Sequence, residues 1–320
     1  MRRIVIYPSD KEIEVAVFGD IPEVRGSFPY PECSCEVGSI VSTIRETLGF
    51  EDFDAGITTY GVIEPTHQEF LELTPERVRA LSENRLGTDK TNIASVILAL
   101  LLPKKTYIAY PLTFDSLPEM SHLSGIPQIT RRVVAHALDH ITVAKKSNKS
   151  KLLTVYLSGG EISTAAHVNG KILDITNSFD GEGPMTPTRS GFFHQRCVYK
   201  MALSGIFSKD DLISKIREKG GLLAHLGTSD LSEIRLKIKN GDTKAKLIYD
   251  AMVYQIAKSI GRMNPLLKDK AEALIFTGPL SKDYKLVSEI ADYIAYIGPI
   301  SVANDFDYPR ILDDILLERL

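Results

Sequence analysis

The sequence predicts an α/β protein made of two duplicated halves, and two patterns along the chain carry that prediction. One is a weak internal repeat, in which residues 3–25 and 151–175 each read as a short apolar strand, a polar loop, a second strand and a two-residue turn. The other is the alternation of strand-like runs with segments of helical periodicity, which is typical of α/β folds with mixed sheets.

The repeat keeps a constant spacing. Three pairs of similar positions lie 150 residues apart: Val5 and Val155, Ala16 and Ala166, Gly19 and Asn169. Asn169-Gly170 between alternating strands is a strong signal for a tight hairpin turn, and we expect Gly19-Asp20 to form the matching turn. A constant offset favours duplication of a domain over the chance occurrence of two hairpins.

Apolar residues recur at helical spacing in three segments between the strands. The first segment begins at Thr88 or Asp89, either of which can cap a helix. The second covers residues 128–146, and the third covers residues 243–263.

Ala273–Thr277 reads as a buried strand that ends at Gly278. The polar run KKSNKSK at residues 145–151 interrupts the periodicity, as a junction between two lobes would. We therefore expect an N-terminal lobe over residues 1–148 and a C-terminal lobe over residues 149–300.

Composition and charge exclude several classes of function. The chain has 320 residues with ordinary hydrophobic and charged fractions, and its formal net charge of -3 provides no basic field for nucleic acid. Its longest apolar run, residues 93–102, is too short to cross a membrane, and the N-terminus does not resemble a signal peptide. Cysteines at 33, 35 and 197 form no disulfide framework, so we expect a cytoplasmic protein.

Three glycine-rich loops are candidate ligand sites: Ser158–Glu161, Phe179–Gly191 and Lys219–Asp230. Glycines let backbone N–H groups approach a phosphate without an intervening side chain. The chain contains no GxxxxGK[ST] motif, and no GxGxxG follows its first strand. These absences argue against a P-loop nucleoside triphosphatase and a Rossmann dinucleotide site.

The second of these loops also carries charges. Asp180 and Glu182 are carboxylates that could hold Mg²⁺, and Arg189 could neutralise a phosphoryl group during its transfer. The alternative interpretation is a surface turn with an ion pair. The residues alone leave both interpretations open.

Residues 174–191, DITNSFDGEGPMTPTRSG, resemble the signature DVNNALDGEGPFSPERSG of butyrate kinases. These enzymes belong to the acetate kinase family of the actin-like ATPase superfamily. The likeness continues through Gly220–Asp230 and Ala251–Lys258 and is sparser at Ser124–Pro127 and His136–Leu138. It therefore spans most of the chain.

The resemblance implies two duplicated actin-like (ribonuclease H-like) lobes with a nucleotide cleft between them. It implies that a C-terminal segment from about residue 300 to 320 returns to the first lobe. Members of the family use ATP and Mg²⁺ to phosphorylate a short-chain carboxylate, which gives an acyl phosphate. The implied partners are a nucleotide, a small carboxylate and a second copy of the chain, which associates through the second lobe and its apolar helix at 246–263.

The resemblance also implies roles for particular residues. Arg189 would be catalytic, and Asp115 is the nearest substitute for a catalytic aspartate of the family that this chain lacks. Asp180 and Glu182 would hold the metal ion. The nucleotide would contact the following positions: Gly159, Gly160, Gly181, Gly183, Gly220, Gly221, Asp230 and Gly278.

The chain departs from the family pattern mainly in the first lobe. A phosphate-contacting loop that opens with Asn in the family begins here at Tyr7. The position of the family's acyl-site arginine falls near Thr59 in this chain. Tyr110 stands in place of the family's catalytic aspartate. In the glycine loop, Leu157 replaces a histidine and Glu161 replaces the third glycine.

These departures leave three functions open. The first is the family's carboxylate kinase activity. The second is a catalytically impaired nucleotide-binding protein with a regulatory or assembly role, and the third is a kinase for a different acceptor.

His136 and His140 are spaced as a possible metal pair on one helix face. No carboxylate completes a known zinc motif around them. We therefore interpret both histidines as structural.

Overall fold

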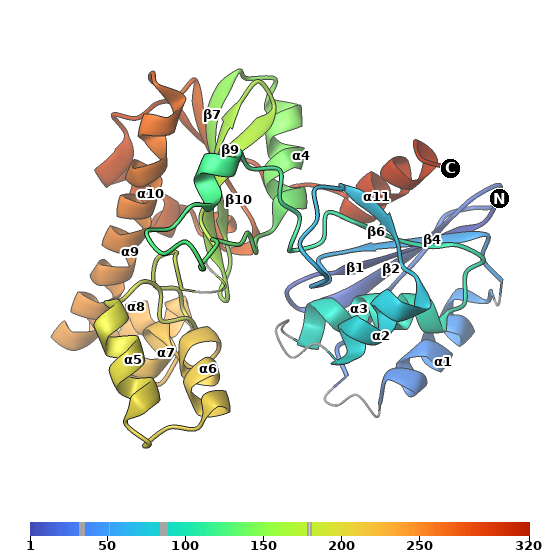
Figure 1. Ribbon diagram of the computed structural model, residues 1–320, viewed down its shortest axis with the longest axis horizontal. Coiled ribbons are helices and arrows are strands. Elements are labelled where there is room, and N and C mark those ends of the chain that lie inside the picture. Colours follow the sequence, from blue (N-terminus) through green and yellow to red (C-terminus); the bar gives the residue numbers. More distant parts are fainter. Residues whose placement is uncertain (32–35, 51, 84–88, 178, 180) are drawn as a thin grey trace. The chain divides into compact units, whose positions relative to one another are not determined.

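The structure is a computed structural model that describes residues 1–31, 36–50, 52–83, 89–177, 179 and 181–320. It divides the chain into two compact units, each with its own sheet and its own hydrophobic core (Figure 1). Unit 1 comprises Met1–Asp115 and Asp305–Leu320, and unit 2 comprises Ser116–Asn304. The predicted α/β class with two duplicated halves is confirmed.

The sheet of unit 1 starts as an antiparallel meander and continues with parallel strands. Its strand order is β3-β2-β1-β4-β6-β5. The pairs β1–β2 and β2–β3 are antiparallel, whereas β1, β4 and β6 run parallel. The strands are β1 (Arg3–Pro8), β2 (Glu12–Phe18), β3 (Val24–Pro29), β4 (Ala55–Thr59), β5 (Phe70–Glu72) and β6 (Thr106–Ala109).

The sheet of unit 2 repeats this arrangement. Its order is β11-β10-β7-β8-β9, again with an antiparallel β7–β8–β9 meander and parallel β7, β10 and β11. Read from its other edge, the order matches that of β3-β2-β1-β4-β6. The strands are β7 (Lys151–Leu157), β8 (Ile162–Val168), β9 (Lys171–Ile175), β10 (Ala273–Thr277) and β11 (Ile300–Val302). The predicted strand at 273–277 is confirmed.

The structure corrects the offset of the repeat from 150 to 149 residues. Ile4 and Ile6 face the core of unit 1, and their counterparts on the core face of unit 2 are Leu153 and Val155. Side chains alternate between the two faces of a strand, so an alignment that is wrong by one residue pairs a core side chain with one on the opposite face. The identity of Val5 and Val155 was therefore misleading.

Only one of the two predicted hairpin turns has the predicted form. Asn169 and Gly170 form a two-residue turn with φ of +52° and +76°, and Val168 pairs with Lys171 across it. In unit 1 the last pair of β2 and β3 is Val17 with Val24, and residues 19–23 connect the two strands. Pro22 lies in this connection and cannot donate a ladder hydrogen bond, which is why Gly19-Asp20 is not a tight turn.

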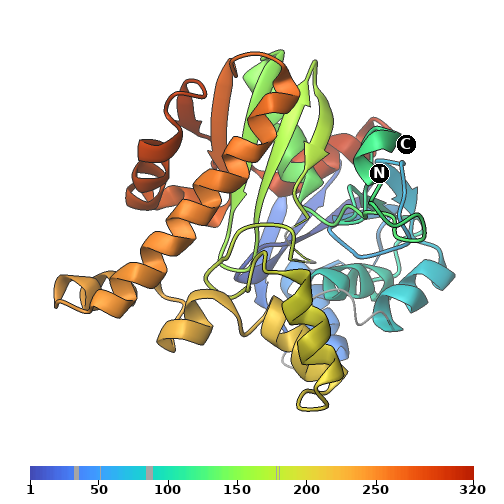
Figure 2. The same cartoon turned by 60° about the vertical axis from the view of Figure 1, so that its left-hand side comes forward.

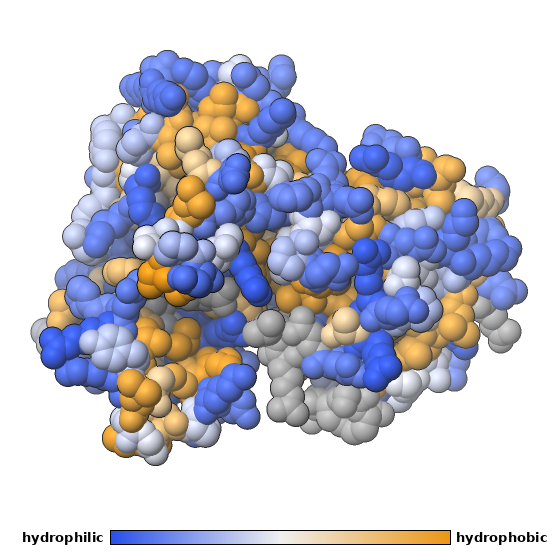
Figure 3. All heavy atoms as spheres, in the orientation of Figure 1, coloured by the Kyte–Doolittle hydropathy of each residue, from blue (hydrophilic) through white to orange (hydrophobic). Residues whose placement is uncertain are grey.

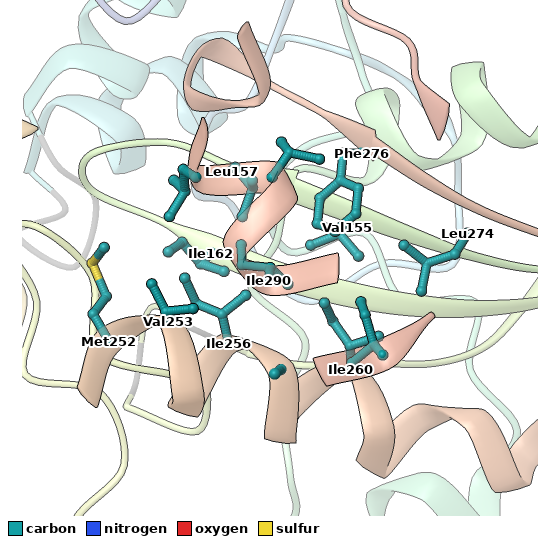
Figure 4. Close-up of a cluster of buried hydrophobic side chains, with 14 of the residues drawn as sticks. Val155, Leu157, Ile162, Met252, Val253, Ile256, Ile260, Leu274, Phe276 and Ile290 are labelled. Atoms are coloured by element: carbon teal, nitrogen blue, oxygen red, sulfur yellow. The ribbon is translucent and has the colours of Figure 1, made fainter. Parts of the chain in front are cut away.

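One face of the unit 2 sheet is covered by α9 (Thr243–Met263) and α10 (Tyr284–Ile294). Figure 2 shows α9, in orange, lying along the sheet. In Figure 4, side chains of α9 and of the strands form one apolar cluster, which includes Met252, Val253, Ile256 and Ile260 with Val155, Leu157, Leu274 and Phe276. The predicted helix at 243–263 is confirmed, and its apolar face is part of this core.

In the part of the chain that the structure describes, unit 2 has four further helices between β9 and α9, and two of them, at residues 221–226 and 231–239, add Leu222, Leu231 and Ile234 to this core. They are α5 (Gln195–Leu203), α6 (Lys209–Arg217), α7 (Gly221–Leu226) and α8 (Leu231–Lys239), with 3₁₀ turns η2 (Glu119–His122), η3 (Asn264–Leu267) and η4 (Pro279–Lys282). No side chain of α5 is buried. Apolar side chains therefore show on the surface over α5 and α6 at the lower left of Figure 3, Leu203 and Ile206 being 83% and 76% exposed.

In unit 1, α1 (Val37–Leu48) and α3 (Asp89–Leu100) cover one face of the sheet, and α2 (Pro75–Glu83) packs on α3. The predicted helix near 89 is confirmed, although Thr88 lies outside the described residues, as do Cys33 and Cys35. Cys197 is exposed and forms no disulfide. Among the residues that the structure describes, none of the helices combines the length and apolar character that crossing a bilayer requires.

The second face of each sheet is covered by a helix that follows the last strand of the other unit. α4 (Ala137–Ser147) comes after β6 and packs on β7 and β10, and α11 (Tyr308–Leu317) comes after β11 and packs on β1. The division therefore falls after Asp115, whereas the sequence predicted it after residue 148. The chain re-enters unit 1 at Asp305, where the resemblance implied such a return.

The helix predicted over residues 128–146 begins only at Ala137. Before it, Leu123 and Thr130 pair in an isolated β-bridge, and Val133 and Val134 are buried without helical structure. The apolar spacing before residue 137 therefore reflected burial of an irregular segment and not helical periodicity.

Candidate functional site

The first glycine loop is a tight turn at the carboxyl end of β7. The backbone N–H of Ser158 donates to Glu161 O at 2.8 Å, and the N–H of Glu161 donates to Ser158 Oγ at 2.9 Å. Gly159 and Gly160 form its tip, and a Cβ at Gly159 would meet nothing within 4 Å. The turn thus presents backbone groups to open space, as a phosphate-binding loop requires.

The second loop packs against the first. The carbonyl of Gly159 accepts hydrogen bonds from the hydroxyls of Thr186 (3.0 Å) and Thr188 (3.1 Å). Gly181 has a φ of +85°, and Gly183 O accepts the N–H of Phe192. The structure therefore brings together two of the loops that the sequence singled out.

The third loop meets the second through its glycines. The N–H of Gly220 donates to Thr188 O at 2.8 Å, and a Cβ on Gly220 would lie 2.4 Å from Ser190 N. Gly221 has a φ of +60°, and a Cβ there would lie 1.9 Å from Thr186 O. These two glycines are required by the close approach of two backbones.

Two further predicted positions have structural contacts. Asp230 caps α8, because its side chain accepts the N–H groups of Ser232 and Glu233. Gly278 follows β10 with a φ of +84°, and a Cβ there would lie 2.7 Å from Leu157 O. Gly278 thus lies against the end of β7 from which the glycine turn starts.

Arg189 is buried inside unit 2, where it is 6% exposed. Its guanidinium packs over the ring of Phe179, its Nε donates to Arg217 O at 3.2 Å, and its Nη1 lies 4.0 Å from Glu161 Oε2. Arg189 is therefore held next to the glycine turn by protein groups on several sides.

Glu161 and His136 form a contact that the sequence did not predict. Nδ1 of His136, the residue before α4, lies 3.0 Å from Oε2 of Glu161. The imidazole stacks on the ring of Tyr156 at 4.4 Å and 14°. Burial alone would raise the pKa of the Glu161 carboxyl, but His136 and Arg189 beside it hold that pKa below its ordinary value.

Glu182 is the centre of an arginine cluster. Its Oε2 accepts from Nε of Arg131 at 3.0 Å, and its Oε1 accepts from Nη2 of Arg262 at 2.8 Å. Arg131 also pairs with Asp174 at 2.7 Å. Asp180 lies outside the described residues, among which no group of three or more His, Cys, Asp or Glu side chains could hold a metal ion.

His140 belongs to a neutral polar network beneath α4. Its Nδ1 lies 2.6 Å from Thr154 Oγ1, its Nε2 lies 3.0 Å from Ser163 Oγ, and His167 Nε2 lies 2.8 Å from the same Thr154 hydroxyl. Burial lowers the pKa of His140 well below its ordinary value and that of His167 to about 4. His136, before the helix, makes separate contacts, so His136 and His140 do not act as a pair.

Unit 1 contains the positions where the family pattern is replaced. Tyr7, Thr59 and Tyr110 lie at the carboxyl ends of β1, β4 and β6. Tyr7 stacks on Tyr308 at 4.8 Å, Thr59 Oγ1 donates to Tyr110 O at 3.3 Å, and Tyr110 Oη donates to Glu69 at 3.1 Å. These side chains are packed among neighbours of unit 1.

Asp115, the last residue of unit 1 before the division, is 7% exposed. Its N–H donates to Thr66 O at 2.8 Å, and its carbonyl contacts His67 Nδ1. Its backbone is therefore held by the segment between β4 and β5.

The fold identifies the class of protein. The structure matches the crystal structure of acetate kinase from Porphyromonas gingivalis with a TM-score of 0.77 and 18% identity, with 100% of each chain covered. The crystal structure of acetate kinase from Entamoeba histolytica gives a TM-score of 0.78 at 16% identity, with the same coverage. The chain thus has the fold of the acetate kinases.

Sequence comparison identifies the family. A model described as the acetokinase family matches residues 127–301. Butyrate kinase 2 of Clostridium acetobutylicum is 27% identical over 314 residues, which are 94% of this chain and 88% of that protein. A probable butyrate kinase of Bacteroides thetaiotaomicron is 34% identical over 262 residues, which are 78% of this chain and 74% of that protein. The chain belongs to the acetokinase family, and the predicted relationship is confirmed.

Proposed function

We propose that this protein transfers the γ-phosphoryl group of magnesium-bound ATP to a short-chain carboxylate, which gives an acyl phosphate and ADP. The observation that supports the proposal is membership in the acetokinase family, with a relative named butyrate kinase aligned over 94% of the chain. The open glycine turn of unit 2 supplies a place for the phosphates.

The proposed step joins two anions. A carboxylate oxygen attacks the γ-phosphorus, the bond from that phosphorus to the β–γ bridging oxygen breaks, and the electron pair leaves with ADP. Positioned donors and cations must offset the repulsion. We propose that the N–H groups of Gly159 and Gly160 donate hydrogen bonds to the phosphates and that Arg189 supplies the positive charge near them. Asp115 remains the proposed catalytic carboxylate from unit 1.

The remaining predicted residues shape the loops in this proposal. Gly181, Gly183, Gly220, Gly221, Asp230 and Gly278 hold the backbone around the turn. Mg²⁺ enters as part of the nucleotide substrate. Glu182 does not fit a ligand for this ion, because both of its oxygens accept from Arg131 and Arg262.

A second function is a nucleotide-binding protein that does not transfer the phosphoryl group and has a regulatory or assembly role. Unit 1 favours it, because the family's polar groups are replaced by the packed side chains of Tyr7, Thr59 and Tyr110. A kinase for a different acceptor is the third alternative. For each of these functions we propose, from the family resemblance, that the protein is a cytoplasmic homodimer. Light scattering at micromolar concentration should then give a mass of twice the 35.5 kDa of one chain.

Trapping with hydroxylamine across short-chain acids tests the first function. Wild type should form a hydroxamate with ATP and Mg²⁺ and none with either omitted. Asp115→Ala should lose this turnover, whereas the control Asp54→Ala, at a partly exposed position, should keep it. Hydroxamate formation that is unchanged in Asp115→Ala would remove that residue from the site.

Thermal unfolding separates the functions. A ligand at a hundredfold excess over its Kd stabilises a protein by about 2.7 kcal/mol, so ATP with Mg²⁺ should raise the Tm of wild type and of Asp115→Ala. Arg189→Ala should lose the shift. A shift without hydroxamate from any acid would favour the second and third functions over the first, and no shift would contradict all three functions.

A further inference from the structure

A two-pronged ion pair joins α8 to the start of α10 in unit 2. Nη1 of Arg235 donates to Oδ2 of Asp283 at 2.6 Å, and Nη2 donates to Oδ1 at 3.0 Å. Asp283 also caps α10 by accepting the N–H of Leu286. Burial alone would raise the pKa of the Asp283 carboxyl, but its hydrogen bonds with Arg235 hold that pKa below its ordinary value. The contact is therefore between two charged groups in a defined geometry.

A tyrosine supports the guanidinium from α9. Nη2 of Arg235 also donates to Oη of Tyr249 at 3.0 Å, and this hydroxyl donates in turn to Glu289 of α10. Arg235 is thus bonded to groups of both neighbouring helices. A lysine cannot reproduce this arrangement, because its single ammonium group lacks the planar fork that meets both carboxylate oxygens.

Arg235 also lines a groove between α8 and α10. Both helices pack on α9, and a cavity of about 560 Å³ is lined by side chains of all three, among them Ser232, Arg235, Lys246, Tyr249, Lys285 and Glu289. Side chains do not fill this space. The spacing of α8 and α10 along the groove therefore depends on polar contacts as well as on their packing against α9.

The ion pair connects two segments that carry predicted nucleotide contacts. Asp230 caps the helix to which Arg235 belongs. Gly278 precedes the 3₁₀ turn η4, which leads directly to Asp283. Ser281 fastens this turn, because its N–H and its hydroxyl both donate to Gly278 O, at 3.1 and 2.6 Å. A change in the spacing of α8 and α10 would therefore move the Asp230 and Gly278 segments relative to each other.

We propose that Arg235 is a positioning residue for nucleotide binding: its pair with Asp283 holds the Asp230 segment and the Gly278 segment at the spacing that the bound nucleotide requires. Arg235 does not touch the nucleotide and acts through these two segments. A nucleotide that must first draw both segments into place binds more weakly, because ordering them costs free energy. The inference rests on the nucleotide-binding part of the proposed function and not on the transfer step.

The first test is calorimetric titration with ADP and Mg²⁺. Arg235→Met keeps the aliphatic stem but removes the fork, and it should raise the Kd roughly tenfold, a typical effect of a group that is coupled to a site it does not touch. Asp283→Asn can still cap α10 but loses the charge. The effects of the two substitutions on Kd should not add in the double variant.

Unfolding measurements on the same variants separate positioning from support of the fold. A merely structural pair would lower the free energy of unfolding and leave the Kd for ADP unchanged, which would overturn the inference. Arg235→Lys is the variant to read if Arg235→Met does not fold. It keeps the charge without the fork, so its Kd should still rise several-fold, and an unchanged Kd would again contradict the proposal.

A second ion pair in the groove provides the matched control. Lys246 and Asp250 pair at 2.6 Å within α9, so they line the same groove but connect no two helices. Lys246→Met should therefore leave the Kd for ADP unchanged. A loss equal to that of Arg235→Met would mean that the groove itself contacts the nucleotide, and it would overturn the positioning role.

Steady-state kinetics and binding distinguish this inference from the proposed function. In an active enzyme, Arg235→Met should raise KM for ATP much more than it changes kcat or KM for the acid. A wild type that binds ADP but forms no acyl phosphate would contradict the transfer alone, and the Kd series would still decide the inference. A wild type that binds no ADP in the presence of Mg²⁺ would overturn both.

Discussion

Glycines of the glycine-rich loops serve two different purposes in this protein. Gly159 lies at an open turn tip, where nothing would obstruct a Cβ. Gly221 lies under the carbonyl of Thr186, with a left-handed φ of +60°. The family resemblance implies a nucleotide contact at both positions, but only the first has space for a ligand.

Alanine substitutions should separate these purposes. Gly221→Ala should lower the free energy of unfolding by roughly 2–5 kcal/mol, because it combines a left-handed φ with a clash. Gly159→Ala should change it by less than about 0.5 kcal/mol and should reduce the Tm shift produced by ATP with Mg²⁺. Urea unfolding and thermal shift measure the two effects. Equal stability losses in both variants would contradict this distinction.

At the scale of elements, α4 covers a face of the unit 2 sheet that is unusually polar. Thr154, Ser163 and His167 point from the strands toward His140 on the helix and form hydrogen bonds with it or with one another. The opposite face, under α9 and α10, is apolar. The helix is therefore held by hydrogen bonds of neutral histidines, and these depend on pH.

The pH dependence of stability should report this network. His167 has a pKa of about 4 in the folded protein against an ordinary value of 6.5, so the unfolded chain binds the proton more readily. The contribution of neutral His167 to stability is complete above pH 6.5 and is lost as the pH falls toward 4. The free energy of unfolding should fall by about 3 kcal/mol over this range. Urea unfolding between pH 7.5 and 4.5 should show this slope.

His167→Gln provides the control for that slope. The variant can keep a hydrogen bond to Thr154 but does not titrate in this range. Its free energy of unfolding should therefore fall less steeply below pH 6.5 than that of wild type. Equal slopes for the two proteins would show that His167 is not the titrating group.

At the scale of the whole molecule, the chain returns to its beginning. Arg3 in β1 and Asp313 in α11 form a two-pronged ion pair at 2.7 and 3.0 Å, and the carboxylate is fully buried. The Asp313 hydrogen bond raises the pKa of the guanidinium. The last helix thus completes the first sheet.

Removing one partner of this pair should be costly. Asp313→Ala leaves Arg3 buried without its counter-charge, and we expect unit 1 to lose about 3–5 kcal/mol of stability. The adjacent Asp314 is exposed, so Asp314→Ala should have almost no effect. Chemical denaturation measures both variants. A similar small change in both would show that α11 does not depend on the ion pair.

Patterns among neighbouring residues were sufficient to predict the local features of this protein. The strands at 3–8 and 151–157, the Asn169-Gly170 turn, the helix at 243–263 and the signature at 174–191 all follow from short-range patterns. Alternation, turn chemistry and helical spacing are local properties, so one sequence is sufficient to read them.

Contacts between residues that are distant in the chain became known only from the three-dimensional fold. The repeat register depended on which face of β7 belongs to the apolar core, and the division of the chain depended on the sheets that α4 and α11 cover. The contact of Glu161 with His136 also joins separate elements, and no periodicity encodes it. Such contacts are set by packing between elements, where burial and charge pairing act through space and not along the chain.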